Sequence, residues 1–175
     1  MPVSLYVQSM QALDLPRRYR TIIVPSSSFL HLTGREDARV ALKRFRAHLA
    51  PGGQLAMSMR VFEPDPTAEQ WELVEHAVRP GDGAEVQHWF RCTYDVPHQL
   101  QHTEDRYDVV LDGTVLESQS LAASPCMTWY SVTQAIALLV ETGFGEVKCH
   151  ADFTVEPAAD GETSFIVLGR RPAAV

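Results

Sequence analysis

Cysteine is scarce in this sequence, and the few copies form no recognisable pattern. The three cysteines, Cys92, Cys126 and Cys149, are odd in number, and no two of them form a Cys-x-x-Cys pair. This argues against a disulfide framework of the kind that small secreted domains use. We therefore expect reduced, buried thiols in a cytoplasmic protein.

Long hydrophobic runs and an excess of positive charge are also missing. No apolar run approaches the roughly 20 residues that span a bilayer, and the N-terminus lacks the pattern of a signal peptide, so we expect no membrane segment. The chain has 15 Lys and Arg against 22 Asp and Glu, a net charge of −7. The only tight basic group is Arg17, Arg18 and Arg20. Because nucleic-acid-binding surfaces show as basic patches, we expect no nucleic-acid partner.

The first third of the chain predicts a β-α-β unit. Apolar, β-rich runs predict strands at 4–8, 19–24 and 54–59. The capping-box spacing of Thr33-Gly-Arg-Glu36 predicts a helix over 36–48. One apolar stripe follows at helical spacing, namely Ala38, Ala41, Leu42, Phe45 and Leu49. The succession of strand, helix and strand implies a parallel strand pair with a right-handed crossover.

The middle of the chain changes to antiparallel β patterning. A possible capping box at Thr67–Gln70 predicts a short helix that carries Trp71, Val74 and Val78. Alternating β-rich runs then predict strands, and Asp112-Gly113 is a two-residue hairpin signal. The predicted strands cover 86–94, 101–111 and 114–121. We interpret residues 84–122, approximately, as an antiparallel insertion in one domain, 1–175.

The last third returns to α/β patterning. Ser131-Val-Thr-Gln134 is a second possible capping box, and Gly143 stands where a helix C-cap glycine belongs. We expect a helix between them and closing strands at 144–149 and 164–169. The length of 175 residues and the 45% hydrophobic content fit this single α/β domain.

The strand at 19–24 stops at Pro25 and presents three small hydroxyl residues, Ser26, Ser27 and Ser28. Small polar residues at the carboxyl end of a strand often face a ligand in open α/β sheets. The alternative is a Pro-Ser turn that only ends the strand. Both interpretations stay open at this point.

Three stretches together resemble class I S-adenosylmethionine-dependent methyltransferases. They are "RRYRTIIVPSSSFLHLTGREDARVALKRFRAHLAPGGQLAMSM", "LLVETGFGEVKCH" and "TSFIVLGRRP". Their order and spacing are similar to the family's strand that ends at the cofactor, the helix, the Pro-Gly-Gly turn and the later strands. The resemblance implies a partial Rossmann-like methyltransferase sheet with helices on its faces and an antiparallel β insertion.

The family's strongest cofactor elements are absent. The Gly-x-Gly turn lets backbone amides approach the cofactor, and an acidic residue about 20 residues later takes the ribose hydroxyls. The first glycine here is Gly34, Arg20 stands where the family often has an acidic residue, and Ser9 stands where it often has Asp. The resemblance therefore implies a chain truncated at its N-terminus, with S-adenosylmethionine binding weakened or lost.

The resemblance also implies roles for several residues. Ser9 and Met10 would flank the adenine, and Pro25, Ser26, Ser27 and Ser28 would contact the cofactor; a plain strand end is the alternative. His31 would be a base on the substrate side, although a lone histidine before a helix is more often structural. Apart from the resemblance, Phe29, Arg60, Trp89 and Trp129 are candidates for an acceptor pocket that takes a small-molecule substrate; for the aromatic residues the alternative is packing in the core.

Other chemistries find less support. His98 and His102 are four residues apart, but Pro97 argues against a helical metal pair, so we expect no metal site. No Gly-x-Ser-x-Gly elbow is present, which argues against a hydrolase. The main hypothesis is a truncated small-molecule methyltransferase. The alternatives are a non-catalytic dimerising or partner-binding remnant, a piece of a longer active enzyme, and a small-ligand binding module that uses the antiparallel strands. We expect a second copy or another chain to cover the apolar edge at 21–24.

Overall fold

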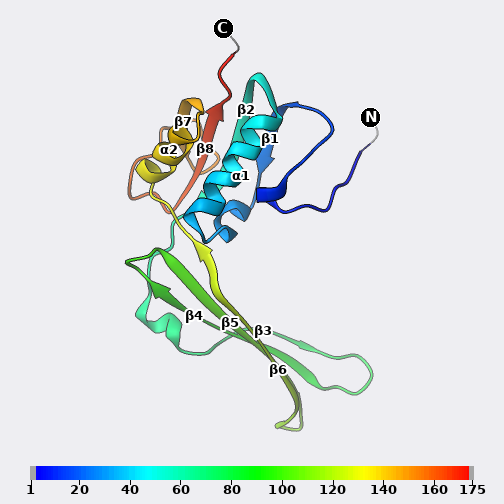
Figure 1. The fold of residues 1–175 in the computed structure, drawn as a ribbon. Helices are drawn as coiled ribbons and strands as arrows, with labels where there is room; N and C mark the ends of the chain where they lie inside the picture. The colour runs from blue at the N-terminus through cyan, green and yellow to red at the C-terminus, as the bar shows by residue number, and fades with distance from the viewer. Residues whose placement is uncertain (1–2, 174–175) are drawn as a thin grey trace. The chain divides into compact units, whose positions relative to one another are not determined.

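The computed structural model describes residues 3–173 and divides the chain into two compact units (Figure 1). The first unit runs up to Phe62 and resumes at Trp129, and the second comprises Glu63–Thr128. The predicted insertion at 84–122 lies within the second unit. No helix among residues 3–173 is long and apolar enough to cross a membrane.

The first unit is a four-stranded sheet with the order β1-β2-β8-β7. Its strands are β1 (Tyr19–Val24), β2 (Leu49–Arg60), β7 (Gly145–Ala151) and β8 (Ser164–Arg170). β1 and β2 are parallel, which confirms the predicted β-α-β unit, whereas β8 runs antiparallel to both β2 and β7. The mixed α/β class is thus confirmed.

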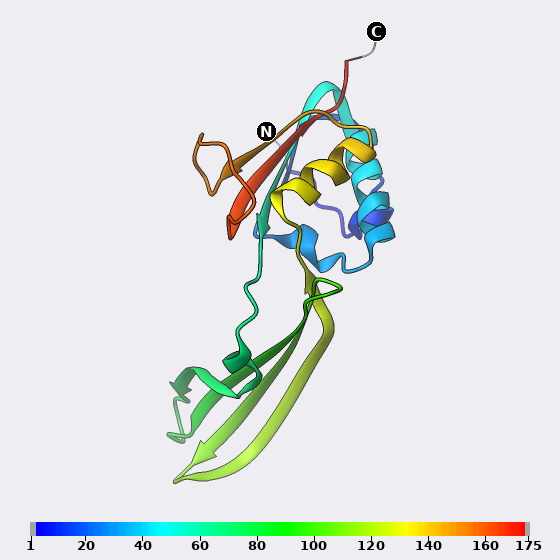
Figure 2. The same cartoon turned by 90° about the vertical axis from the view of Figure 1, so that its left-hand side faces the viewer.

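Both helices of the first unit, α1 (Arg35–His48) and α2 (Val132–Glu141), cover the same face of this sheet (Figure 2). The predicted stripe of α1 is buried against the sheet, with Ala38, Ala41 and Leu42 fully inaccessible. The predicted capping box at Thr33 is wrong, because Gly34 is the N-cap and no side chain caps the helix. Acidic residues in the first turn of α1 and basic residues in the last complement its dipole instead.

The capping box of α2 is confirmed. The Ser131 hydroxyl accepts from the amide of Gln134 at 3.2 Å, and the Ser131 amide donates to the Gln134 side chain at 2.9 Å. Gly143 follows the helix with φ +90°, as the C-cap pattern predicts. These signals are local in sequence, which explains why α2 is predictable.

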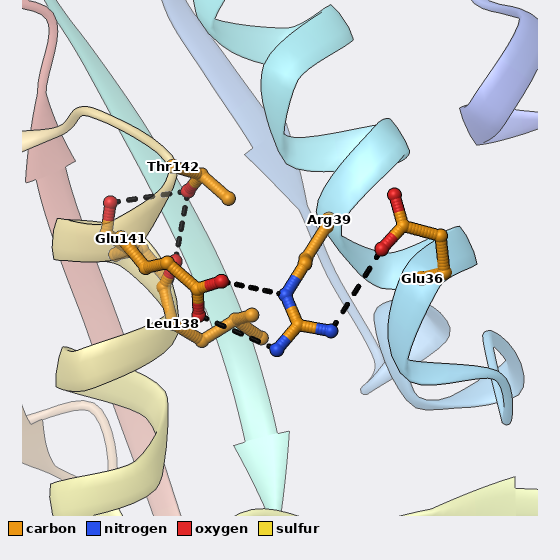
Figure 3. A network of polar contacts seen from close by, with 6 residues as sticks. Glu36, Arg39, Leu138, Glu141 and Thr142 are labelled. Atoms are coloured by element: carbon orange, nitrogen blue, oxygen red, sulfur yellow. Dashed lines mark hydrogen bonds and ion pairs between the residues drawn. The ribbon is translucent and has the colours of Figure 1, made fainter.

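Among residues 3–173, an ion pair joins the two helices (Figure 3). Arg39 of α1 donates from Nε to the Glu141 carboxylate of α2 at 2.8 Å, and Glu36 lies 3.9 Å from the same guanidinium. The Thr142 hydroxyl donates to the carbonyls of Leu138 and Leu139 at 2.8 and 3.1 Å and so provides hydrogen bonds to carbonyls in the last turn of α2. The ion pair links α1 to the C-terminal end of α2, and the Thr142 bonds lie within α2 itself.

A glycine brings β1 close to β2. A Cβ on Gly53 would lie 2.8 Å from the Ala50 carbonyl oxygen and 3.0 Å from that of Arg20, both backbone atoms. Gly52 beside it has φ +72°. The Pro-Gly-Gly segment is thus part of β2 and allows the tight start of the parallel pair, rather than only forming a turn.

The predicted strand at 4–8 is wrong. These residues have no regular structure, and Leu5 and Val7 are 90% and 105% exposed. A short 3₁₀ helix, η1 (Met10–Ala12), follows and lies against α1. Residues 4–8 pair with no strand of the described chain, so apolar alternation alone does not make a strand here.

The second unit is a four-stranded antiparallel sheet in the order β3-β4-β5-β6. Its strands are β3 (Glu72–Val78), β4 (Glu85–Asp95), β5 (Leu100–Leu111) and β6 (Thr114–Thr128). The Asp112-Gly113 hairpin is confirmed, with φ of 49° and 75° at the two positions. The predicted short helix is wrong, because only η3 (Pro66–Glu69) is helical and Val74 and Val78 belong to β3, which pairs with β4.

Candidate functional site

A hollow of about 450 Å³ lies at the carboxyl end of β1. Along β2, Leu55 and Met57 are fully buried, whereas Ala56 and Ser58 between them are part-exposed. Because side chains alternate along a strand, Ala56 and Ser58 face away from the helices. The hollow therefore opens on the face of the sheet that α1 and α2 leave uncovered.

The floor and walls of the hollow combine apolar groups with hydroxyls. Its lining consists of Ile23, Val24, Pro25, Ser26, Ser27, Ala56, Met57, Ser58, Phe153, Ser164 and Ile166. None of these side chains is ionisable. Phe153 and Ile23 are 82% and 69% exposed, so large apolar surfaces stand open at its rim. This lining suits an uncharged ligand group with an apolar face and hydroxyl-bonding atoms.

The serines at the end of β1 adopt an unusual backbone conformation. Ser26 and Ser27 both have φ of 55°, the left-handed region that non-glycine residues seldom occupy. The Ser27 amide donates to the hydroxyl of Ser58 at 2.9 Å, and the Ser28 amide and hydroxyl donate to the Pro25 carbonyl at 3.1 and 2.7 Å. Such strain persists only where neighbours hold it, and it is typical of ligand-binding turns.

A β-branched residue at this turn tests the strain directly. Ser27→Val is expected to lower the free energy of unfolding by about 1–3 kcal/mol, because valine tolerates positive φ poorly. Ser27→Gly keeps the turn without the steric cost and is expected to stay within about 1 kcal/mol of the parent protein. Urea denaturation of both variants measures the difference. Equal stability of the valine and glycine variants would contradict a strained turn.

The loop between β7 and β8 supplies Phe153 and is tied to α2. The Asp160 carboxylate accepts from the Thr133 amide at 3.0 Å and from the Thr133 hydroxyl at 2.6 Å, at the start of α2. The Thr133 hydroxyl, followed by its amide, lowers the pKa of Asp160 below its ordinary value of 3.8. The charged carboxylate thus anchors the loop that forms one wall of the hollow.

This anchor predicts a pH dependence of stability. Because the folded pKa of Asp160 is lowered, its contribution is present above pH 3.8 and is lost as the pH falls below that value. Asp160→Asn is therefore expected to flatten the acid limb of a thermal-unfolding curve measured against pH. Glu156→Gln, in the same loop, is the control, since the Glu156 carboxylate has no hydrogen bond within residues 3–173. An unchanged acid limb in Asp160→Asn would contradict the anchor.

The residues just after the serine turn do not line the hollow. Phe29 is fully buried and packs against Tyr130, with ring centroids 6.3 Å apart. His31 ends the 3₁₀ helix η2 (Ser28–His31) and is exposed. The catalytic role of His31 and the acceptor role of Phe29 stay predictions, and the structure gives Phe29 the packing of a core residue.

Ser9 and Met10 lie on the other side of the sheet. They open η1, which contacts α1, and the following segment is fixed by the Leu15 amide donating to Nε2 of His48 at 2.9 Å. Nδ1 of the same ring lies 2.9 Å from the Arg44 carbonyl, so Nδ1 carries the proton. The structure thus places the predicted adenine-contacting pair on the helix-covered side, apart from the hollow.

The predicted acceptor residues are not gathered at the hollow either. The guanidinium of Arg60 lies 5.6 Å from the Phe62 ring, and Phe62 also contacts Trp129 edge-on at 6.0 Å between ring centroids. Trp89 belongs to the second unit, where the guanidinium of Arg106 lies 5.3 Å from its ring. Their role in one acceptor pocket stays a prediction.

A smaller hollow of about 320 Å³ lies in the second unit. Its charged side chains already pair with each other, since Arg91 donates to both Glu104 oxygens at 3.0 and 2.8 Å. Nδ1 of His102 lies 2.7 Å from the Ser124 hydroxyl. Within residues 3–173, no group of three or more His, Cys, Asp or Glu could hold a metal ion.

Sequence reasoning missed the members of the hollow that come from distant segments. The alternation of polar and apolar residues in Gln54–Met59 could have indicated Ser58 as the small polar residue next to the serine turn. Phe153, Ser164 and Ile166 carry no such signal, because they follow the turn by more than 120 residues. Only the fold brings them there.

The lining of the hollow suits an uncharged portion of S-adenosylmethionine, but it has no carboxylate for the ribose and no glycine for close backbone contacts. Serine hydroxyls and apolar walls suit an uncharged portion of a ligand. No carboxylate lines the hollow to take ribose hydroxyls, and no glycine lines it to admit the cofactor's close backbone contacts. Within residues 3–173 a complete cofactor site is therefore not assembled around this hollow.

Solved structures show what fold this is, although no family model and no curated protein sequence matches the chain. A S-adenosylmethionine-dependent methyltransferase from Clostridium acetobutylicum superposes with a TM-score of 0.71 at 12% identity, over 96% of this chain and 64% of that one. CalS10, an amino pentose methyltransferase from Micromonospora echinaspora, gives 0.59 at 17% identity, over 93% and 63%. The sugar N-methyltransferase KedS8 from Streptoalloteichus gives 0.59 at 19% identity, over 94% and 61%.

These likenesses cover nearly all of this chain, which has a class I methyltransferase-like fold. The chain spans less than two thirds of the length of each of the three structures. The predicted fold class is therefore confirmed. Identities this low establish the fold alone.

Proposed function

We propose that this chain is a portion of a S-adenosylmethionine-dependent methyltransferase that acts on a small molecule, and that it binds the cofactor only weakly by itself. The observation that carries the proposal is the methyltransferase-like fold over nearly the whole chain. The similar structures include an amino pentose methyltransferase and a sugar N-methyltransferase, which supports a small-molecule acceptor.

Methyl transfer requires little covalent chemistry from the side chains of the protein. In methyl transfer the cofactor brings the activated methyl group, and the protein aligns the acceptor and excludes water. The strained serine turn and the Ser58 hydroxyl offer fixed polar contacts, and Ile23 and Phe153 offer apolar walls. The absence of a carboxylate and a glycine from this lining is the reason to expect weak binding.

Calorimetric titration with S-adenosylhomocysteine tests this proposal. We expect saturable binding with a dissociation constant near the millimolar range, about −4 kcal/mol. Ala56→Phe, which fills the hollow, is expected to abolish the heat. Ala47→Phe is the matched control, because Ala47 is exposed on α1, outside the hollow.

Two outcomes of the titration would contradict the proposal. No heat up to millimolar ligand means that the chain does not bind the cofactor by itself, and favours the partner-binding alternative. Micromolar binding, about −8 kcal/mol, means that the cofactor site is complete and that the weak-binding part is wrong.

The partner-binding alternative has its own observation. β1 pairs with β2 on one side only, and Ile23 in it is 69% exposed. Proteins rarely leave an apolar edge strand bare, so a second copy is the proposed cover. A dimeric mass in solution that Ile23→Lys converts to a monomeric mass supports it. A monomeric mass for the parent chain contradicts it.

A further inference from the structure

Charge is distributed unevenly between the two units. Glu63–Thr128 contains 13 of the 22 acidic residues but only three of the 15 basic ones, a net charge of −10. The remainder of the chain contains nine acidic and 12 basic residues, a net charge of +3. Such an asymmetry favours contacts between opposite surfaces.

Five arginines belong to the start of β1 or to segments that contact it; we call them the arginine cluster. Tyr19 pairs with Leu49, and Nη1 of Arg171 donates to the Leu49 carbonyl at 2.7 Å and to the Arg46 carbonyl at 3.1 Å. Arg18 and Arg46 lie near enough to Arg171 to help lower its pKa, after the larger effect of burial. The cluster comprises Arg17, Arg18, Arg20, Arg46 and Arg171.

The arginine cluster has no acidic partner. Within residues 3–173, none of its five guanidinium groups forms an ion pair with a carboxylate. The arginines of the second unit differ, since Arg79, Arg91 and Arg106 pair with Asp82, Glu104 and Asp108. Two neighbouring arginines also differ in this way. The Arg170 guanidinium pairs with the Glu146 carboxylate at 3.1 Å, whereas the hydrogen bonds of the Arg171 side chain go to backbone carbonyls.

The opposite surface is the edge strand β3 of the second unit. Every residue of β3 is exposed, and β3 pairs with β4 on one side only. Glu69, Glu72 and Glu75 lie in and just before it, and within the described part of the chain their carboxylates form no ion pair. The unpaired edge of β3 is therefore acidic, and the unpaired edge of β1 begins with basic residues, so the two edges have opposite charge.

We propose that a second copy of this chain docks its acidic β3 edge on the arginine cluster, beside the open edge of β1. The inference rests on the partner-binding proposal above and is independent of methyl transfer. The proposed exchange is reciprocal, since each copy supplies its β3 edge to the arginine cluster of the other, which is the pattern of a two-fold dimer. Because the whole chain carries −7, copies repel at long range, and association requires these local opposite charges to meet.

Sedimentation analysis of the full chain tests the contact. Raising the salt from about 0.01 M to about 1 M shortens the Debye length from ~30 Å to ~3 Å, so the dimer is expected to dissociate with salt. Arg17→Glu/Arg18→Glu and Glu72→Lys/Glu75→Lys are each expected to weaken the dimer by about 100-fold or more. An equimolar mixture of the two variants restores opposite charges and is expected to dimerise.

The matched control is Lys43→Glu/Lys148→Glu, which changes the net charge as much as the arginine variant at exposed positions outside the cluster. It is expected to leave the dimer intact. A monomeric parent chain at low salt, a salt-insensitive dimer, or failure of the mixed variants to associate would each overturn the proposal. The sedimentation result does not depend on S-adenosylhomocysteine binding, so its failure is distinguishable from failure of the proposed function.

Discussion

Phe29→Ala is expected to lower the free energy of unfolding by about 3–5 kcal/mol, the range for removing a buried phenylalanine. Phe29 is fully inaccessible and packs on Tyr130 beneath the serine turn. The loss would leave a cavity that the surrounding sheet and helices cannot fill. Denaturant unfolding followed by the helical circular dichroism signal measures it, because α1 and α2 both belong to the first unit.

Phe153→Ala is the matched control for this prediction. Phe153 is 82% exposed at the rim of the hollow, so its removal is expected to change stability by less than about 0.5 kcal/mol. The same variant is expected to weaken ligand binding at the hollow. A small stability loss in Phe29→Ala would contradict the core role of Phe29 and revive its predicted role in the acceptor pocket.

Arg171→Met is expected to cost about 2–3 kcal/mol of unfolding free energy, because hydrogen bonds from charged donors contribute more than neutral ones. The Arg171 guanidinium donates to three carbonyls, those of Arg46 and Ala47 at 3.1 Å and that of Leu49 at 2.7 Å. These carbonyls end α1 and begin β2, and the end of a helix leaves such groups without internal partners. Methionine keeps much of the side-chain volume and removes the donors.

Arg170→Met separates this role from a general loss of charge. Arg170 donates to the Gly52 carbonyl at 3.2 Å and pairs with an exposed glutamate, and surface pairs of this kind contribute little. We expect a change below about 1 kcal/mol in urea denaturation. Equal losses in the two variants would show that the three carbonyl contacts are not the source of the effect.

Local signals decided which parts of the fold were predictable from sequence. The capping box of α2, the Asp112-Gly113 hairpin and the apolar stripe of α1 are each set by neighbours within a few residues. The strand at 4–8 and the helix through Trp71 failed because their outcome depends on a partner strand. The segment after Trp71 pairs with β4 and forms β3, whereas residues 4–8 pair with no strand.

The candidate site was predictable only in part. The serine turn follows from a strand that ends at Pro25, and the structure places Ser26 and Ser27 in the lining of a hollow there, while their contact with a ligand stays a prediction. Phe29 is adjacent in sequence, yet its side chain enters the core because the chain turns into η2. The opposite wall, including Ile166, comes from the last strand, and no local pattern connects it to the serines.

The most direct test of this account is an amide NMR titration of the chain with S-adenosylhomocysteine. The account predicts that the amide signals of Ser26, Ser27 and Ser58 shift as the ligand is added, while those of His102 and Ser124 in the second unit's hollow do not. Shifts centred on His102 and Ser124, or no shift at any of these amides, would contradict a ligand site at the carboxyl end of β1.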